Sequence, residues 1–177
     1  RALSIPSSQR FYAEGEITPG TAERLRHFLD EKKILPDALV HLDSPGGKVV
    51  EAMAIGRLLR ERQLRTTVGA WAPPEGKGGK ARTRPGICLS ACAIAYLGDR
   101  FRFLPDESLY GVHRFRFADG REGGADIAQL LDGVIVSYVA EMGVAPDFFR
   151  ETTRAGSDDM HFPPPRRLRE LRVVTGD

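Results

Sequence analysis

Short apolar runs alternate with amphipathic stretches along most of the chain. The apolar runs, bounded by turn residues, predict strands at 9–17, 38–42, 65–70, 101–104, 109–113 and 172–175. Helical periodicity or runs of small apolar residues predict helices after residue 18 and over 49–63, 90–97, 125–142, 146–154 and 166–171. Strands that alternate with helices are typical of the α/β class, so the pattern predicts an α/β domain.

The first predicted helix has a clear apolar face, whereas one later segment has no regular pattern. The face of the helix consists of Ala22, Leu25, Phe28 and Leu29. Thr18 is the expected N-cap, and Pro19 suits the first turn. The segment 73–86 contains four glycines and four basic residues, which predicts a long loop.

The composition narrows the class of protein. The chain has 177 residues, of which 41% are hydrophobic, and this suits one domain over residues 1–177. No apolar run approaches the roughly 18 residues that span a bilayer, and the prolines and glycines have no period. The 26 basic and 24 acidic residues leave a net charge of +2, which argues against a nucleic-acid partner.

The segment Ser44-Pro45-Gly46-Gly47 lies between a predicted strand and a predicted helix. Two consecutive glycines allow backbone N–H groups to face a cleft without intervening side chains. Beside a helix N-terminus, such groups suit an anion or a developing oxyanion. The same four residues also suit an ordinary tight turn, and the segment alone does not separate the two interpretations.

Ser90 and His113 are the candidate catalytic side chains. Ser90 begins a predicted helix of small residues, where its hydroxyl is exposed and the helix dipole favours developing negative charge. His113 ends a predicted strand, and an imidazole with a near-neutral pKa is the usual base for activating a serine. A helix cap at Ser90 and a structural role for His113 are the alternatives.

The chain has two cysteines, Cys88 and Cys92, which flank Ser90. In an oxidising compartment they can form one local disulfide, and in a reducing one they are small buried apolar residues. Two cysteines do not complete a four-ligand zinc site. His27, His41 and His161 lie apart from them in the sequence, so we expect no metal and no other cofactor.

Taken in order, these motifs resemble those of the Clp protease proteolytic subunit and the wider Clp/crotonase superfamily. The matching segments are Gly15-Glu16-Ile17, Leu42-Asp43-Ser44-Pro45-Gly46-Gly47, Ser90-Ala91 and Val112-His113. The resemblance extends over roughly residues 11–174 and implies a single α/β domain of the Clp/crotonase-like, β-β-α superhelix type. The Ser-Ala-Cys segment is similar to the corresponding segment of Clp-like proteins of bacterial envelopes. This resemblance implies that the protein is located in the envelope or periplasm, with the cytoplasm as the alternative.

The resemblance also implies a serine peptidase that acts on peptides or unfolded proteins. Ser90 would be the nucleophile that forms an acyl-enzyme, and His113 would be the general base. The backbone N–H groups of Gly47 and Ala91 would form the oxyanion hole, with Gly46 shaping the turn.

The acid that orients His113 is expected to be Glu151 or Asp159, although both also suit surface charges. The basic segment 73–86 is longer than in the protease subunit. We interpret it as a lid, as a docking surface for an acidic partner, or as a solvated insertion. The segment 114–124 replaces a strand that would line the substrate groove and carry ring contacts, so assembly into a homo-oligomer is left open.

Two other functions fit the same motifs. A catalytically degenerate Clp-like module would bind a peptide or a partner without cleaving it. An enzyme of the crotonase branch would bind an acyl-thioester with the same oxyanion geometry. The crotonase chemistry needs no Ser–His pair, so the presence of Ser90 and His113 favours the peptidase. The distance between these two side chains tests the choice between catalysis and binding.

Overall fold

The fold is built around a parallel sheet, in a computed structural model that describes residues 9–76, 82–114 and 124–176. The strands of this sheet lie in the order β1 (Arg10–Glu14), β2 (Leu39–Asp43), β3 (Arg65–Val68) and β7 (Arg102–Phe103). Two smaller sheets pair β4 (Ala70–Ala72) with β5 (Arg82–Arg84), and β6 (Ile87–Leu89) with β8 (Leu109–Gly111). The helices are α1 (Thr21–Glu31), α2 (Val49–Glu61), α3 (Ala91–Tyr96), α4 (Gly124–Glu141), α5 (Phe148–Thr152) and α6 (Pro165–Glu170).

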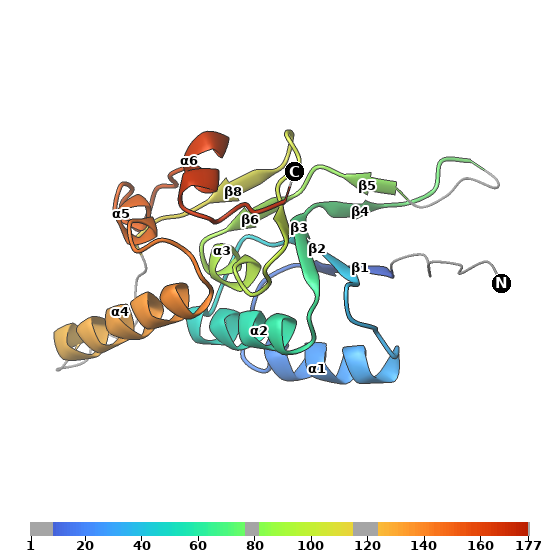
Figure 1. Cartoon of the computed structure of the whole chain (residues 1–177), viewed down its shortest axis with the longest axis horizontal. Helices are drawn as coiled ribbons and strands as arrows, with labels where there is room; N and C mark the ends of the chain where they lie inside the picture. The colour runs from blue at the N-terminus through green and yellow to red at the C-terminus, as the bar shows by residue number, and fades with distance from the viewer. Residues whose placement is uncertain (1–8, 77–81, 115–123, 177) are drawn as a thin grey trace.

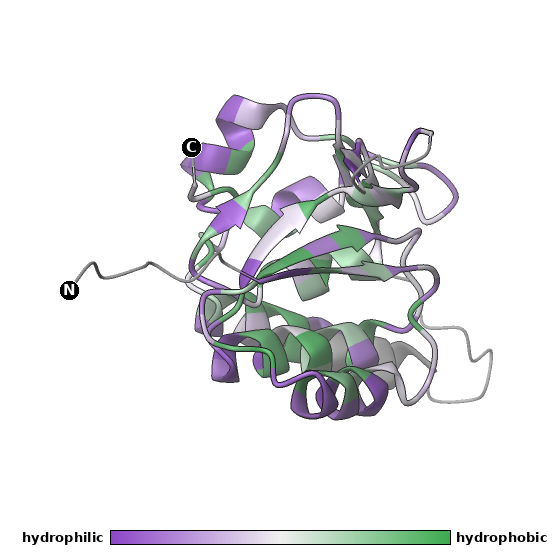
Figure 2. Ribbon diagram, turned by 90° about the vertical axis from the view of Figure 1, so that its right-hand side faces the viewer, coloured by the Kyte–Doolittle hydropathy of each residue, from purple (hydrophilic) through white to green (hydrophobic). Residues whose placement is uncertain are grey.

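Strands and helices alternate through the first half of the chain, which confirms the predicted α/β class. Helices α1 and α2 lie side by side along the sheet (Figure 1). Hydrophobic residues gather where these helices meet the strands (Figure 2), and Leu29, Val40 and Leu59 are almost completely buried there. Among the described residues, no helix combines the length and the apolar character needed to cross a bilayer.

The N-terminus of α1 differs from the prediction. Thr18 is not the N-cap; that position belongs to Gly20, whose φ of 80° is in the left-handed region. The carboxylate of Glu51, in α2, accepts the backbone N–H groups of Gly20 and Ala22 at 3.0 Å each. Two N–H groups at the start of α1 are therefore satisfied by a neighbouring helix, a contact that no local pattern indicates.

The predicted loop 73–86 is in part a β-hairpin. Strand β5 pairs antiparallel with β4. Residues 77–81, between the two strands, lie outside the described residues. The hairpin extends away from the body of the domain (Figure 1). Arg82 forms an ion pair with Glu75, and Arg84 lies 3.6 Å from the Asp43 carboxylate. These two cations are thus already close to acids of the same chain.

The predicted strand at 172–175 does not form. The backbone N–H groups of Thr175 and Gly176 both donate to the carbonyl of Arg102, at 3.0 Å each, so the segment passes β7 without forming a ladder. We also expected the segment 114–124 to replace a strand that would line the substrate groove. Most of this segment, residues 115–123, lies outside the described residues.

Arg102 is a buried cation, with only 2% of its surface exposed. Its guanidinium donates hydrogen bonds to five backbone carbonyls, those of Leu97, Asp99, Met142, Arg172 and Val173. Burial lowers the pKa of Arg102, but an arginine stays charged in proteins. The side chain therefore joins the end of α3, the end of α4 and the C-terminal segment through one charge.

Replacing this cation tests its structural role. We expect Arg102→Met to lower the free energy of unfolding by about 3–5 kcal/mol, because the five carbonyls lose their donor inside the protein. Urea denaturation measures the loss. Arg166→Met is the control, because the Arg166 side chain is 91% exposed and its loss should cost no more than about 0.5 kcal/mol. Equal losses in the two variants would contradict the structural role.

Candidate active site

Ser90 occupies a sharp turn between strand β6 and helix α3. Its φ of 56° and ψ of −121° lie outside the conformations that residues with a side chain normally adopt. The backbone N–H of Ser90 donates to the carbonyl of Gly111 at 2.9 Å, which fixes the turn against β8. Such backbone strain is typical of functional sites, where the surrounding structure holds it in place.

His113 lies beside Ser90 because their two strands are parallel. β6 and β8 pair with Leu89 opposite Gly111, so the chain leaves both strands at the same edge. The Ser90 Oγ and His113 Nε2 atoms are 2.7 Å apart, within hydrogen-bonding distance. With the imidazole protonated on Nδ1, the serine hydroxyl donates to Nε2, which is the arrangement that a general base needs.

The Ser44–Gly47 turn packs directly against this pair. A Cβ atom placed on Gly46 would lie 2.8 Å from the Ser90 Cβ atom and 3.1 Å from the Ala91 nitrogen. Ile17 holds the turn from the other side, donating to the Gly46 carbonyl at 2.7 Å and accepting from Lys48 at 2.8 Å. Only glycine allows this approach to Ser90.

The predicted oxyanion donors lie on the two segments that meet at Ser90. Ile17 pairs with Gly47 in a parallel bridge whose hydrogen bonds use the residues on either side of Gly47. Ala91 is the first residue of α3, where a backbone N–H has no partner within the helix. Within the described ranges, neither N–H donates to another backbone carbonyl.

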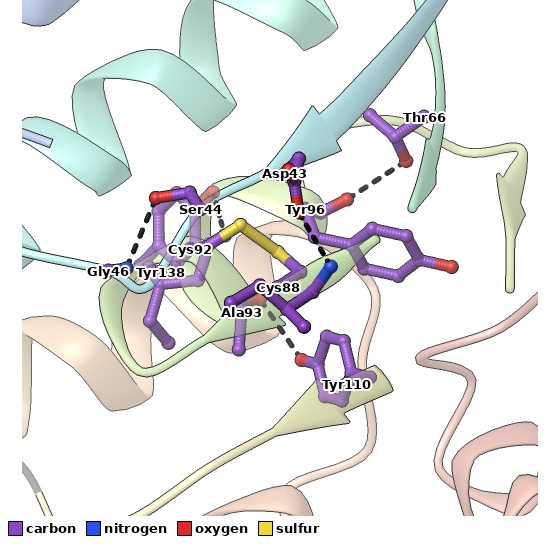
Figure 3. Close-up of a disulfide and its surroundings, with 12 residues drawn as sticks. Asp43, Ser44, Gly46, Thr66, Cys88, Cys92, Ala93, Tyr96, Tyr110 and Tyr138 are labelled. Atoms are coloured by element: carbon purple, nitrogen blue, oxygen red, sulfur yellow. Dashed lines mark hydrogen bonds between the residues drawn. A yellow bond between two sulfur atoms is a disulfide. The ribbon is translucent and has the colours of Figure 1, made fainter. Parts of the chain in front are cut away.

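Ser44 connects the central sheet to β6 (Figure 3). Its N–H donates to the Ile87 carbonyl at 2.7 Å, its carbonyl accepts from Leu89 at 3.0 Å, and its Oγ accepts from Gly46 at 3.1 Å. One buried residue therefore binds the nucleophile strand and the glycine turn together.

Cys88 and Cys92, two residues before and two after Ser90, are joined by a disulfide (Figure 3). Cys88 belongs to β6 and Cys92 to the first turn of α3, and both are buried. The bond therefore links the strand that enters the Ser90 turn to the helix that leaves it.

Of the two candidate acids, Glu151 is committed to other partners. It is 1% exposed, and its oxygens receive hydrogen bonds or ion pairs at 2.9 Å from His161, Arg167 and Arg154. Burial acts to raise the pKa of Glu151, but the hydrogen bonds from Arg167 and His161 outweigh it and hold that pKa below its usual value. We therefore correct the expectation that Glu151 directly orients His113.

Asp159 is exposed, and its Oδ1 atom accepts the N–H of Met160 at 2.7 Å. No hydrogen bond between its carboxylate and His113 is among the contacts of the described residues, so a role as the orienting acid stays a prediction.

The His161–Glu151 pair is part of the site's support that sequence reasoning missed. His161 exchanges two backbone hydrogen bonds of 2.8 Å with Val112, the residue before His113. The buried Glu151 cluster therefore anchors the segment that runs beside His113. The only indication of this pair in the sequence is that Glu151 and His161 lie among several arginines. Their spacing along the chain does not indicate that the two side chains contact each other.

The described residues contain no group of three or more His, Cys, Asp or Glu side chains that could hold a metal ion. The chemistry available to this site is that of a serine hydroxyl beside an imidazole, with backbone N–H groups close by. Such a group of residues can form and hydrolyse an acyl-serine.

The fold and this pair define an α/β protein with a serine and a histidine at one edge of two parallel strands. No known protein family and no curated protein matches the sequence. Among solved structures, a ClpP1 mutant from Listeria monocytogenes matches 96% of this chain and 92% of its own, with a TM-score of 0.67 and 17% identity. The chain therefore has the Clp-protease-like fold that the motifs implied.

The Glu151 cluster predicts a dependence of stability on pH. Because the folded pKa of Glu151 is lowered, its contribution is complete above the unfolded value of about 4.3 and is lost as the pH falls through the folded value. We expect Glu151→Gln to cost about 3 kcal/mol at pH 7 and to lose less stability than the native chain between pH 7 and pH 3.5. Urea denaturation at each pH measures both effects. The exposed Glu16→Gln serves as the control, and parallel pH curves for native and Glu151→Gln chains would contradict the prediction.

Gly46 allows a separate test of the close packing at Ser90. Gly46 and Gly15 both have positive φ, 107° and 98°, but an added Cβ has neighbours at 2.7–3.1 Å only at Gly46 and nothing within 4 Å at Gly15. We expect Gly15→Ala to cost about 1–2 kcal/mol from backbone strain and Gly46→Ala to cost about 1–3 kcal/mol more. Urea denaturation compares them, and equal costs would mean that the turn does not press on Ser90.

Proposed function

We propose that this chain is a serine peptidase that hydrolyses peptide bonds through an acyl-enzyme at Ser90. The observation that carries the proposal is the 2.7 Å hydrogen-bonding distance between Ser90 Oγ and His113 Nε2, at a strained turn packed against Gly46. The shared fold with a Clp protease supports it. A helix cap would not need a histidine at this position, so the alternative interpretation of Ser90 is the weaker one.

The reaction follows from the positions of these groups. His113 Nε2 takes the proton of Ser90 as the Oγ atom attacks the substrate carbonyl, and the N–H groups of Gly47 and Ala91 stabilise the resulting oxyanion. The C–N bond then breaks, and the leaving amine takes the proton from His113. Water, activated by the same imidazole, hydrolyses the ester and restores the Ser90 hydroxyl.

We further propose peptides or unfolded proteins as substrates and a bacterial envelope as the compartment. The disulfide supports the second point, because disulfides persist in oxidising compartments. Asp159 stands as the remaining candidate for the acid that orients His113. We also propose assembly into a homo-oligomer, which sedimentation tests. A further proposal is an acidic partner for the 73–86 segment, which a pull-down with an acidic peptide tests.

Labelling with a fluorophosphonate probe tests the activated serine. We expect the native chain to be labelled, Ser90→Ala to be unlabelled, and His113→Ala to react at least about 100-fold more slowly, because general-base catalysis contributes that much. Ser137→Ala and His27→Ala are the matched controls, since both residues are exposed, on helices α4 and α1.

Two outcomes would contradict the proposal. Labelling of Ser90→Ala at the native rate would place the reactive group elsewhere. A correctly folded native chain that is not labelled, but that binds peptides, would favour the binding module.

A further inference from the structure

The disulfide encloses the candidate nucleophile. Cys88 and Cys92 are four positions apart, and Ser90 is midway between them. The two sulfur-bearing residues lie on different elements, strand β6 and helix α3, so the bond spans the turn at which Ser90 projects. Both cysteines are at most 1% exposed.

The backbone at Ser90 needs an external restraint. Positive φ at a residue with a side chain, outside the left-handed helical region, is strained and persists only where the surroundings impose it. The Ser90 backbone is such a case, at φ 56° and ψ −121°. Its N–H donates to Gly111, which fixes the strand side of the turn.

The helix side of the turn is held by its surroundings. Helix α3 has six residues and no side-chain cap, and a helix this short is not stable in isolation. It is buried against α2, and hydroxyl groups hold two of its carbonyls: Tyr110 donates to Ala93 at 3.0 Å and Tyr138 to Ile94 at 2.9 Å. The covalent link between this helix and strand β6 is the disulfide at Cys92, one residue after the Ala91 N–H.

The other end of the bond is fixed in the sheet. Cys88 forms a parallel bridge with Ser44, the residue that also accepts the Gly46 N–H. The disulfide therefore connects the start of α3 to the same residue that holds the glycine turn. The Ser90 hydroxyl, the Ala91 N–H and the Gly47 N–H are thereby set relative to one another.

We propose that the Cys88–Cys92 disulfide is a positioning element for Ser90, so that the reactivity of the serine depends on the oxidised state of the two cysteines. The inference rests on the proposed function. A dithiol reductant converts the pair to thiols: its thiolate attacks one sulfur, a mixed disulfide forms, and the second reductant thiol releases it. Two electrons and two protons pass to the cysteines, and the reductant becomes a disulfide. The Ser90 backbone then relaxes, and its Oγ atom moves away from His113.

The experiment compares rates of fluorophosphonate labelling in the oxidised and reduced native chain. Reduction uses dithiothreitol in low urea, which admits the reductant to the buried bond, and thiol titration counts the product. After the urea is removed, we expect the reduced chain to be labelled at least tenfold more slowly, and oxidised glutathione to restore the rate. Reduced and oxidised forms contain the same side chains, so a difference reports the bond rather than lost packing.

A double variant, Cys88→Ala with Cys92→Ala, provides the second arm. It should be labelled as slowly as the reduced chain at a temperature where circular dichroism shows that both are folded, and it should not respond to oxidised glutathione. A folded, reduced chain that is labelled within twofold of the oxidised rate would overturn the proposal.

Nuclear magnetic resonance of the histidines separates this inference from the proposed function. The ring ¹⁵N signals of His113, assigned with His113→Gln, report its hydrogen bond with Ser90. If the oxidised chain is not labelled at all, the peptidase proposal fails, and a change of these signals on reduction still supports the positioning role. Signals unchanged by reduction would overturn it whatever the labelling shows.

Discussion

The geometry of the candidate site depends on the hydrogen bonds of one buried residue, Ser44. Its backbone pairs with Ile87 and Leu89 in the strand that precedes the nucleophile, while its hydroxyl accepts the N–H of Gly46. Backbone hydrogen bonds fix positions to a few tenths of an ångström. The end of β2 therefore determines how far the glycine turn lies from Ser90. The parallel pairing of β6 with β8 determines how far His113 lies from Ser90.

The sequence allowed prediction of those parts of the fold and site whose signals are local. The strand–helix order up to β3 follows from apolar periodicity. Ser90 and His113 are recognisable because one lies at the start of a helix and the other at the end of a strand. Their separation of 23 residues along the chain does not predict the distance between their side chains. Only the pairing of two short parallel strands brings them together, and strands of three residues carry too little periodicity to be paired from sequence.

The features that sequence reasoning missed depend on partners far along the chain. Glu51 caps a helix from another helix, and strand β5 was hidden because its residues are exposed and basic. Glu151 was one of the two acids expected to orient His113, yet its charge is taken up by His161 and two arginines. A carboxylate in a polar segment looks the same in sequence whether it is exposed or buried in an ion cluster, so the distinction needs the packed structure.

The burial of Arg102 also affects when the contacts of the fold can be completed during synthesis of the chain. Two of its carbonyl partners, on Arg172 and Val173, are 70 and 71 positions later in the chain. At the roughly 5–20 residues per second of protein synthesis, the ribosome needs several seconds to produce them after Arg102 has been made. During that interval Arg102, beside the end of α3, has at most three of its five carbonyl acceptors. The contacts that join α3, α4 and the C-terminal segment are therefore completed only when residues 172 and 173 have been made.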